Sequence, residues 1–183
     1  YFLYRAEFGE ATEVPGVLRY TDYDMASRLA FFVSNQAPDL ELLNAAATGA
    51  LGTVDALSQQ VTRLLQSEHG TRAVAGFAEE LFHLRALRTK AKDADLFPDY
   101  SQDLIAAMNE EMKRDWAFAL TSGQSALTLF NAREATVNAP LAELYGIDST
   151  GLDETTFERR ALPADGPRAG MLGKAALHSL FAN

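Results

Sequence analysis

Residues 101–120 read SQDLIAAMNEEMKRDWAFAL, and this stretch decides the fold. Ser101 is a residue type that caps the start of helices, and Gly123, just beyond the stretch, is one that ends them. Between them Ile105, Met108 and Met112 recur three or four residues apart, which places their side chains on one face of a helix. The stretch therefore predicts an amphipathic helix whose apolar face packs against other helices.

The same pattern continues on both sides of this helix. Upstream, Thr21, Asp39, Thr53 and Thr71 each precede apolar residues at helical spacing and are predicted caps. Downstream, shorter helices are predicted over residues 126–130, 138–145 and 171–181. Short loops between amphipathic helices predict an all-α fold, a compact multi-helix bundle of about six to eight helices. Residues 1–183 are predicted to form a single helical domain.

Two details of the N-terminal helices are specific predictions. The helix after Thr21 is predicted to bury one face, which consists of Met25, Leu29, Phe32 and Val33. The helix after Thr53 is predicted to stop at Gly70, so that Thr71 caps the next one.

The helical pattern breaks over residues 147–168, which are rich in Asp, Ser, Thr, Gly and Pro. This length is unusual for a plain loop. It predicts a long irregular excursion that packs on another part of the parent protein. A short extended segment is compatible with residues 155–159, but no sheet is required.

Composition and charge exclude several classes of function. The chain carries 25 acidic and 16 basic residues, a formal net charge of −9, and such a surface repels nucleic acid. It has no cysteine, which excludes disulfides, thiolate nucleophiles and covalent haem attachment within these residues. No apolar run approaches the roughly 20 residues that a membrane-spanning helix needs.

The pair Glu80 and His83 has the Glu-x-x-His spacing of carboxylate-bridged di-iron bundles. Such sites need the motif twice, and neither His69 nor His178 has a Glu three residues before it. A hydrogen bond between the two side chains within one helix is therefore favoured over a metal site, and no metal or cofactor is predicted for this fragment.

Glu111 and Asp115 lie one helical turn apart, and like charges at this spacing destabilise a helix unless a cation lies between them. One interpretation is an acid–base or cation site, because burial raises the pKa of a carboxyl group. The favoured interpretation is a salt bridge to an arginine of a neighbouring helix, such as Arg28 or Arg72.

Residues 166–175 read GPRAGMLGKA and partly match a phosphate-binding loop. That loop requires Gly where Arg168 stands, Ser or Thr where Ala175 stands, and a buried strand before it. We reject the phosphate loop. Gly170 and Gly173 instead predict a close approach to another part of the protein.

Several runs, taken together, match a known pattern. They are 1–9 (YFLYRAEFG), 20–32 (YTDYDMASRLAFF), 38–39 with 41–43 (PD and ELL), 135–138 (ATVN), 141–142 (LA) and 145–146 (YG). In order and spacing they resemble a helical domain of unknown function in large secreted proteins of planctomycetes and myxobacteria, where it accompanies cytochrome-c-like modules. The resemblance implies an extracytoplasmic parent protein that continues past Asn183 and a haem carried by another module. It transfers no catalytic residue, and a Trp common where Leu81 or Phe82 stands is missing.

Three hypotheses follow. The favoured one is a non-catalytic structural or interaction domain, a fragment of an extracytoplasmic, cytochrome-associated multidomain protein, with the other domains of that protein as partners. The second is an extracytoplasmic enzyme domain, an oxidoreductase or a polymer-degrading enzyme, with the candidate catalytic residues Glu80, His83, Glu111 and Asp115. It requires Glu111 within about 10 Å of His83. The third is a polysaccharide- or peptide-binding module whose exposed aromatic side chains would be Tyr1, Tyr20, Tyr23 and Tyr100.

Overall fold

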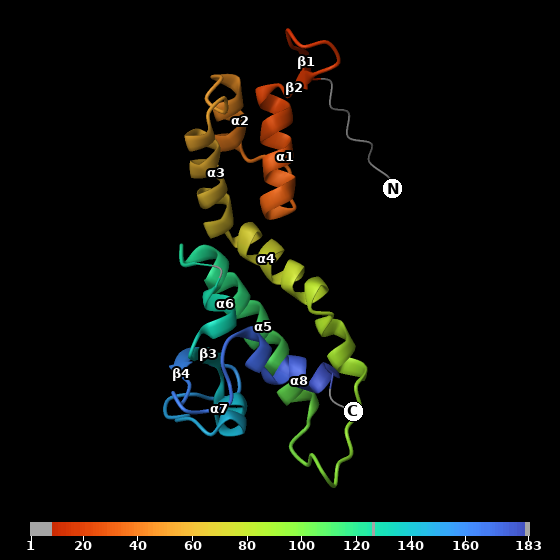
Figure 1. Ribbon diagram of the computed structural model, residues 1–183, viewed down its shortest axis with the longest axis vertical. Helices are drawn as coiled ribbons and strands as arrows, with labels where there is room; N and C mark the ends of the chain where they lie inside the picture. The colour runs from red at the N-terminus through yellow and green to blue at the C-terminus, as the bar shows by residue number, and fades with distance from the viewer. Residues whose placement is uncertain (1–8, 126, 182–183) are drawn as a thin grey trace. The chain divides into compact units, whose positions relative to one another are not determined.

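The computed structural model of the chain describes residues 9–125 and 127–181. The chain divides into two compact units, Tyr1–Ala73 and Val74–Asn183. Helices dominate both units, and the strands of the described residues form two small two-stranded sheets (Figure 1). The predicted helical character is confirmed, while the sheets depart from a purely helical fold. That residues 1–183 form a single domain stays a prediction, which the division into two compact units does not test.

The N-terminal unit is a short hairpin followed by packed helices. Strands β1 (Glu10–Ala11) and β2 (Leu18–Arg19) pair antiparallel. Helix α1 (Asp22–Ser34) then packs against both α2 (Leu40–Ala47) and α3 (Val54–Gln66). The core between them consists of Ala26, Ala30, Val33, Leu42, Ala46, Leu51 and Leu64.

The predicted caps of these three helices are confirmed. The side chain of Thr21 accepts a hydrogen bond from the backbone N–H of Asp24, whose carboxylate accepts one from the backbone of Thr21 in return. Asp39 and Thr53 cap α2 and α3 in the same way. Each cap satisfies a backbone donor that the first turn of a helix leaves without a partner.

The predicted buried face of α1 is wrong at Phe32, whose side chain is 91% exposed. The fully buried positions are Ala26 and Ala30, with Val33 beside them, while Met25 and Leu29 are only partly buried. Small side chains at this spacing let α2 and α3 approach α1 closely, so the large apolar residues lie at the margin of the interface.

The predicted boundary at Gly70 is also wrong. Helix α3 ends at Gln66, and α4 (Glu68–Leu81) has already begun when the chain reaches Gly70. A Cβ atom at Gly70 would lie 2.0 Å from the backbone oxygen of Leu64. Gly70 is therefore needed because α4 begins in close contact with the end of α3, and Thr71 lies inside α4 instead of capping it.

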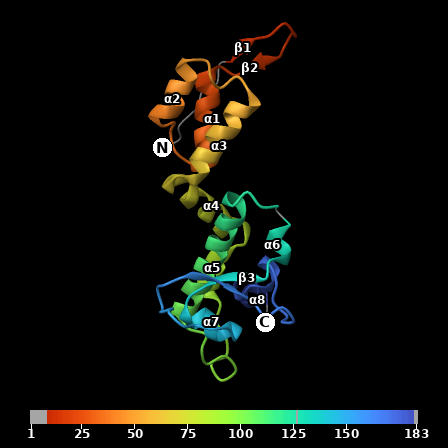
Figure 2. The same cartoon turned by 90° about the vertical axis from the view of Figure 1, so that its left-hand side faces the viewer.

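The C-terminal unit is organised around α5 (Gln102–Thr121), which Ser101 caps as predicted. Helix α5 packs against the 3-10 helix η1 (Leu84–Thr89), α6 (Thr128–Asn131), β3 (Glu134–Val137), α7 (Ala139–Tyr145) and α8 (Ala175–Phe181) (Figure 2). The helix predicted over residues 138–145 is confirmed as α7, which begins one residue later because Asn138 is its cap, and Gly146, with a φ of 67°, follows its end. The predicted final helix is split into η2 (Met171–Gly173) and α8.

The excursion over residues 147–168 contains β4 (Glu158–Ala161), which pairs antiparallel with β3. The register places Glu134 opposite Ala161 and Val137 opposite Glu158. Leu162, just after β4, is buried in the core of the same unit. The excursion is therefore anchored within this unit, and its contact with other parts of a parent protein stays a prediction.

No helix in residues 9–125 and 127–181 has both the length and the apolar character needed to cross a lipid bilayer.

Candidate functional site

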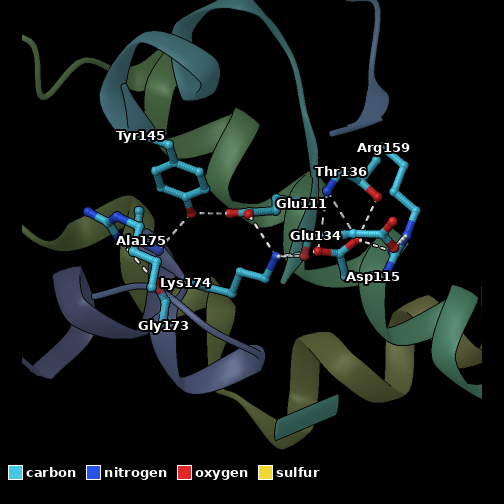
Figure 3. A network of polar contacts seen from close by, with 10 residues as sticks. Glu111, Asp115, Glu134, Thr136, Tyr145, Arg159, Gly173, Lys174 and Ala175 are labelled. Carbon is cyan, nitrogen blue, oxygen red and sulfur yellow. Dashed lines mark hydrogen bonds and ion pairs between the residues drawn. The ribbon is translucent and has the colours of Figure 1, made fainter. Parts of the chain in front are cut away.

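Helix α5 carries two buried carboxylates one turn apart, Glu111 with 0% and Asp115 with 6% of its surface exposed. Lys174, at the junction of η2 and α8, is 2% exposed and lies against both (Figure 3). Its Nζ forms an ion pair with Glu111 Oε1 at 3.1 Å and contacts Asp115 Oδ2 directly. A cation thus lies between the two carboxylates, as the i, i+4 spacing requires for a stable helix.

The second oxygen of Glu111 is held by Tyr145, the last residue of α7. Tyr145 Oη donates a hydrogen bond of 2.6 Å to Glu111 Oε2 and accepts one of 2.9 Å from the backbone N–H of Ala175. Burial raises the pKa of Glu111, while Lys174 and the hydrogen bond from Tyr145 act in the opposite direction. Burial, followed by the charge of Glu111, raises the pKa of Tyr145. Tyr145 therefore stays protonated and remains a hydrogen-bond donor.

The second oxygen of Asp115 faces the β3–β4 sheet. Asp115 Oδ1 accepts hydrogen bonds from the Thr136 backbone N–H at 3.2 Å, from Thr136 Oγ1, and from Arg159 Nη1 at 3.2 Å. Arg159 also pairs through Nε with Glu134 Oε2 at 2.8 Å, and its guanidinium lies 3.9 Å from the centre of the Phe118 ring. Glu111 Oε1 is therefore paired only with the charge of Lys174, while Glu111 Oε2 and both oxygens of Asp115 accept hydrogen bonds.

These contacts join five elements whose residues are far apart in the sequence, α5, β3, α7, β4 and the start of α8 (Figure 3). We call the group the buried charge cluster; its members are Glu111, Asp115, Thr136, Tyr145, Arg159 and Lys174. Charges buried to this degree are tolerated only when each has a partner, because the loss of hydration costs several kcal/mol for every ion. The cluster therefore connects the central helix to the rest of the unit.

A cavity of about 20 Å³ borders the cluster, with Asp115, Glu134, Arg159 and Lys174 in its wall. This volume holds about one water molecule. The wall also includes Gly170, whose φ is 53° and whose added Cβ would lie 2.2 Å from the backbone oxygen of Phe130. The close approach predicted at Gly170 is confirmed.

The salt bridge predicted for the carboxylates of α5 is present, but the predicted partners are wrong. Arg72 pairs with Glu68, and the guanidinium of Arg28 lies over the ring of Tyr20, both within the N-terminal unit. The cation between the carboxylates is Lys174, 59 residues beyond Asp115. Sequence spacing identified the need for a cation but gave no indication of a partner at this distance along the chain.

Glu80 and His83 do not share a helix face, which corrects the basis of the predicted Glu–His hydrogen bond. Helix α4 ends at Leu81, and His83 adopts the left-handed conformation with a φ of 53°. Both residues are exposed and line a surface depression with Glu79 and Arg85. The structure therefore brings together Glu111 and Asp115. Glu80 and His83 line a different depression, and neither Glu111 nor Asp115 is part of its wall.

Sequence reasoning missed Lys174, Tyr145, Thr136 and Arg159. For Lys174 one signal existed, since it is the single charged residue in the apolar run 171–177, MLGKAAL. A lysine in such a run is expected to be paired. Thr136 and Tyr145 lie in the runs 135–138 and 145–146 that carry the family resemblance, but these runs indicate no role for them, and Arg159 has no comparable signal.

The tyrosines proposed for a binding surface differ in their exposure to solvent. Tyr20 and Tyr23 are 40% and 55% exposed, whereas Tyr100 is partly buried with its hydroxyl group inside the protein. Tyr1 lies outside the described residues. Within residues 9–125 and 127–181, no group of three or more acidic, His or Cys side chains is arranged to hold a metal ion.

A family model described as PSD4, a protein of unknown function (DUF1592), matches residues 20–147, which is more than half of the chain. The matched range includes Glu111, Asp115, Thr136 and Tyr145, and it ends before Arg159 and Lys174. No curated protein and no solved structure matches the chain.

Proposed function

We propose that this chain, which belongs to the PSD4 family of proteins of unknown function, is a non-catalytic structural and interaction module of a larger extracytoplasmic, cytochrome-associated protein. The observation that carries the proposal is the internal pairing of the buried charge cluster. Lys174 is shared by Glu111 and Asp115, and the remaining oxygens of both carboxylates accept hydrogen bonds from protein groups.

A catalytic acid or base has to reach a substrate atom directly or through one water molecule. Glu111 is fully buried, and the adjoining cavity of about 20 Å³ is far below the several hundred Å³ of ordinary ligand sites. The cluster is therefore suited to holding α5 against β3, β4, α7 and α8. Its charges determine the shape of the unit.

The interaction role rests on the apolar surface of α1. Phe32 is 91% and Phe31 46% exposed, and both line a shallow depression with Met25 and Leu29. Exposed aromatic side chains that gather in one patch are typical of surfaces that bind other proteins. Other modules of the parent protein are the proposed partners. The extracytoplasmic location and the association with cytochrome modules are supported by the family resemblance described from the sequence.

The test is binding between this chain and the rest of its parent protein, produced separately and measured by titration calorimetry. Phe32→Ser is expected to weaken binding by about tenfold or more. The matched control is Leu96→Ser, which removes an apolar side chain that is 72% exposed in another part of the chain. Absence of binding by the unmodified chain, or equal effects of the two variants, would contradict the proposal.

An enzymatic role is the second candidate, and one observation favours it: Asp115 and Lys174 both border a cavity. Such an enzyme would use these two residues instead of His83. Elemental analysis and an absorption spectrum of the purified chain separate the two candidates. The structural role predicts neither a stoichiometric metal nor a haem band, and a stoichiometric metal that disappears in Asp115→Asn would favour the enzyme.

A further inference from the structure

Lys174, Asp115 and Glu111 form a buried group in which an amine, a carboxyl group and a second carboxylate meet. Lys174 Nζ contacts Asp115 Oδ2, and Glu111 Oε1 lies 3.1 Å from the same nitrogen. The three side chains are between 0% and 6% exposed. Bulk water is thus excluded from the point where the amine meets the carboxyl group.

The far side of the Asp115 carboxyl group is surrounded by hydrogen-bond donors. Oδ1 accepts from the Thr136 backbone N–H, from Thr136 Oγ1 and from Arg159 Nη1. In acyl transfer the carbonyl oxygen gains negative charge as the nucleophile attacks, and fixed donors at that oxygen lower the barrier. One oxygen of Asp115 therefore faces a nucleophile, while the other lies where such charge would be stabilised.

From this geometry we propose that Lys174 and Asp115 form an intramolecular isopeptide bond, with Glu111 as the residue that carries the proton. The neutral amine of Lys174 attacks Cγ of Asp115, so that the Nζ–Cγ bond forms. The Cγ–Oδ2 bond then breaks, and Oδ2 leaves as water after it has gained two protons. The ammonium and carboxylate of the ion pair become one neutral amide and one water molecule. No oxidant, reductant or other reactant is needed.

Glu111 is placed for the proton transfers. Its Oε1 is beside Lys174 Nζ, while the hydrogen bond from Tyr145 fixes Oε2. Burial raises the pKa of Glu111, which makes it a better acceptor for an ammonium proton. The proton leaves Lys174 for Glu111 and reaches Oδ2 of Asp115 from there.

Two physical effects favour the bond over the ion pair. Holding the amine against the carboxyl group removes most of the entropy cost of bringing the two groups together. A buried amide also avoids the desolvation cost that two buried ions carry. Glu111 then has no ammonium beside it, and burial, which raises the pKa of Glu111, favours its neutral form there. The cavity of about 20 Å³ next to Asp115 and Lys174 has room for the water molecule that is released.

The inference goes beyond the proposed function and does not rest on it, because the bond would form whether or not the module binds a partner. The bond would replace the ion pair between Lys174 and Asp115 and hold α5 to the start of α8 through the same two residues. The direct test is the mass of the intact, denatured chain. The proposal predicts a mass lower than that of the sequence by one water molecule. A mass equal to that of the sequence overturns it.

Loss of water has another source in this chain, because Asp165 is followed by Gly166, a sequence prone to succinimide formation. A tryptic digest distinguishes the two. The isopeptide bond joins the peptide 115–133 to the peptide 169–183, and it blocks cleavage after Lys174. Loss of water confined to the peptide that contains Asp165 overturns the proposal.

Variants test the roles of the individual groups. Lys174→Arg is expected to have the full mass of its sequence, and Asp115→Asn is expected to lose ammonia instead of water, because the leaving group is then an amide nitrogen. Glu111→Gln keeps an acceptor for Tyr145 and is expected to retain its full mass. The role of Glu111 would be overturned if the digest of Glu111→Gln contained as much of the cross-linked peptide as the digest of the unmodified chain. If a variant does not fold, the mass and digest of the unmodified chain still decide whether the bond exists.

Discussion

Asp39 in the N-terminal unit and Asp115 in the C-terminal unit both accept a hydrogen bond from a backbone N–H and both pair with a cation. Asp39 accepts from Leu42 and pairs with Arg63 at 2.6 Å, and its side chain is 46% exposed. Asp115 accepts from Thr136 and pairs with Lys174 and Arg159, but it is only 6% exposed.

The difference shows what burial changes. Water can replace Arg63 as the partner of Asp39, so the pair adds little to stability. In the C-terminal unit water cannot enter to replace Lys174, so the loss of one partner leaves an uncompensated charge inside the protein. Chemically similar contacts therefore fix a helix end in one unit and hold the whole core together in the other.

The largest effect is expected from Lys174→Met. It leaves Glu111 without a cation and removes one of the two cations of Asp115, and such changes to buried pairs cost about 3–5 kcal/mol. Lys174→Met also prevents the isopeptide bond proposed above, so the loss of that cross-link acts in the same direction. Denaturation by urea, followed by circular dichroism, measures the loss. Lys113→Met is the matched control. Lys113 and Glu110 form a pair on the same helix whose side chains are 23% and 40% exposed, so its loss should cost at most about 1 kcal/mol. If both variants lost the same unfolding free energy, burial would not determine how much such a charge pair contributes to stability.

The next largest effect is expected from Gly170→Ala. Both Gly170 and Gly123 have a positive φ, which costs an alanine about 1–2 kcal/mol. At Gly170 the added Cβ also meets the backbone of Phe130, and overpacking of this kind adds about 1–3 kcal/mol. At Gly123 no atom lies within 4 Å of the added Cβ. The midpoints of thermal unfolding should therefore fall further for Gly170→Ala than for Gly123→Ala, and the reverse order would contradict the close approach at Gly170.

Asp39 offers a smaller effect that separates two contributions. Asp39→Ala removes both the cap of α2 and the pair with Arg63, and should cost about 1 kcal/mol. Asp39→Asn keeps an oxygen that can cap the helix and loses only the charge. It should cost about 0.5 kcal/mol or less by urea denaturation. A loss above about 3 kcal/mol for Asp39→Asn would mean that this exposed pair behaves like the buried charge cluster.

The smallest effect concerns pH. The backbone N–H groups of Thr155 and Thr156 lower the pKa of Asp153 to about 2 from an ordinary value of 3.8. Because the folded-state pKa is the lower one, the stabilisation by Asp153 is fully present above 3.8 and is lost as the pH falls through about 2. The difference in unfolding free energy between the unmodified chain and Asp153→Ala should shrink over that window. A difference that stays constant from about pH 2 upwards would contradict this assignment.

The sequence predicted the features that local chemistry determines. The sequence predicts Thr21, Asp39, Thr53 and Ser101 as caps, because a cap is defined by residues within three positions of it. Gly70 was misread as a helix end, because its role depends on how α4 meets the end of α3. Phe32 was wrongly predicted to be buried for the same reason. The spacing of apolar residues defines a helix face, but it does not determine which residues of that face a neighbouring helix covers.

The candidate site was predicted only in part for the same reason. The i, i+4 spacing of Glu111 and Asp115 indicated that a cation was needed. The cation comes from Lys174, and the donors to Asp115 come from β3 and β4, whose pairing joins segments more than 20 residues apart. Contacts at such separations are set by the packing of the whole unit, and the pattern of any one helix does not specify them.

The central claim is that the buried charges of the C-terminal unit stabilise its fold as a mutually compensated set. The most direct test compares the unfolding free energy of Lys174→Met with that of Lys174→Met combined with Glu111→Gln. The second change removes the uncompensated charge and keeps the acceptor for Tyr145. The double variant should therefore be more stable than Lys174→Met alone by about 1 kcal/mol or more. The claim would be contradicted if the double variant were less stable than Lys174→Met alone. The loss of stability would then be the sum of the losses in the two single variants.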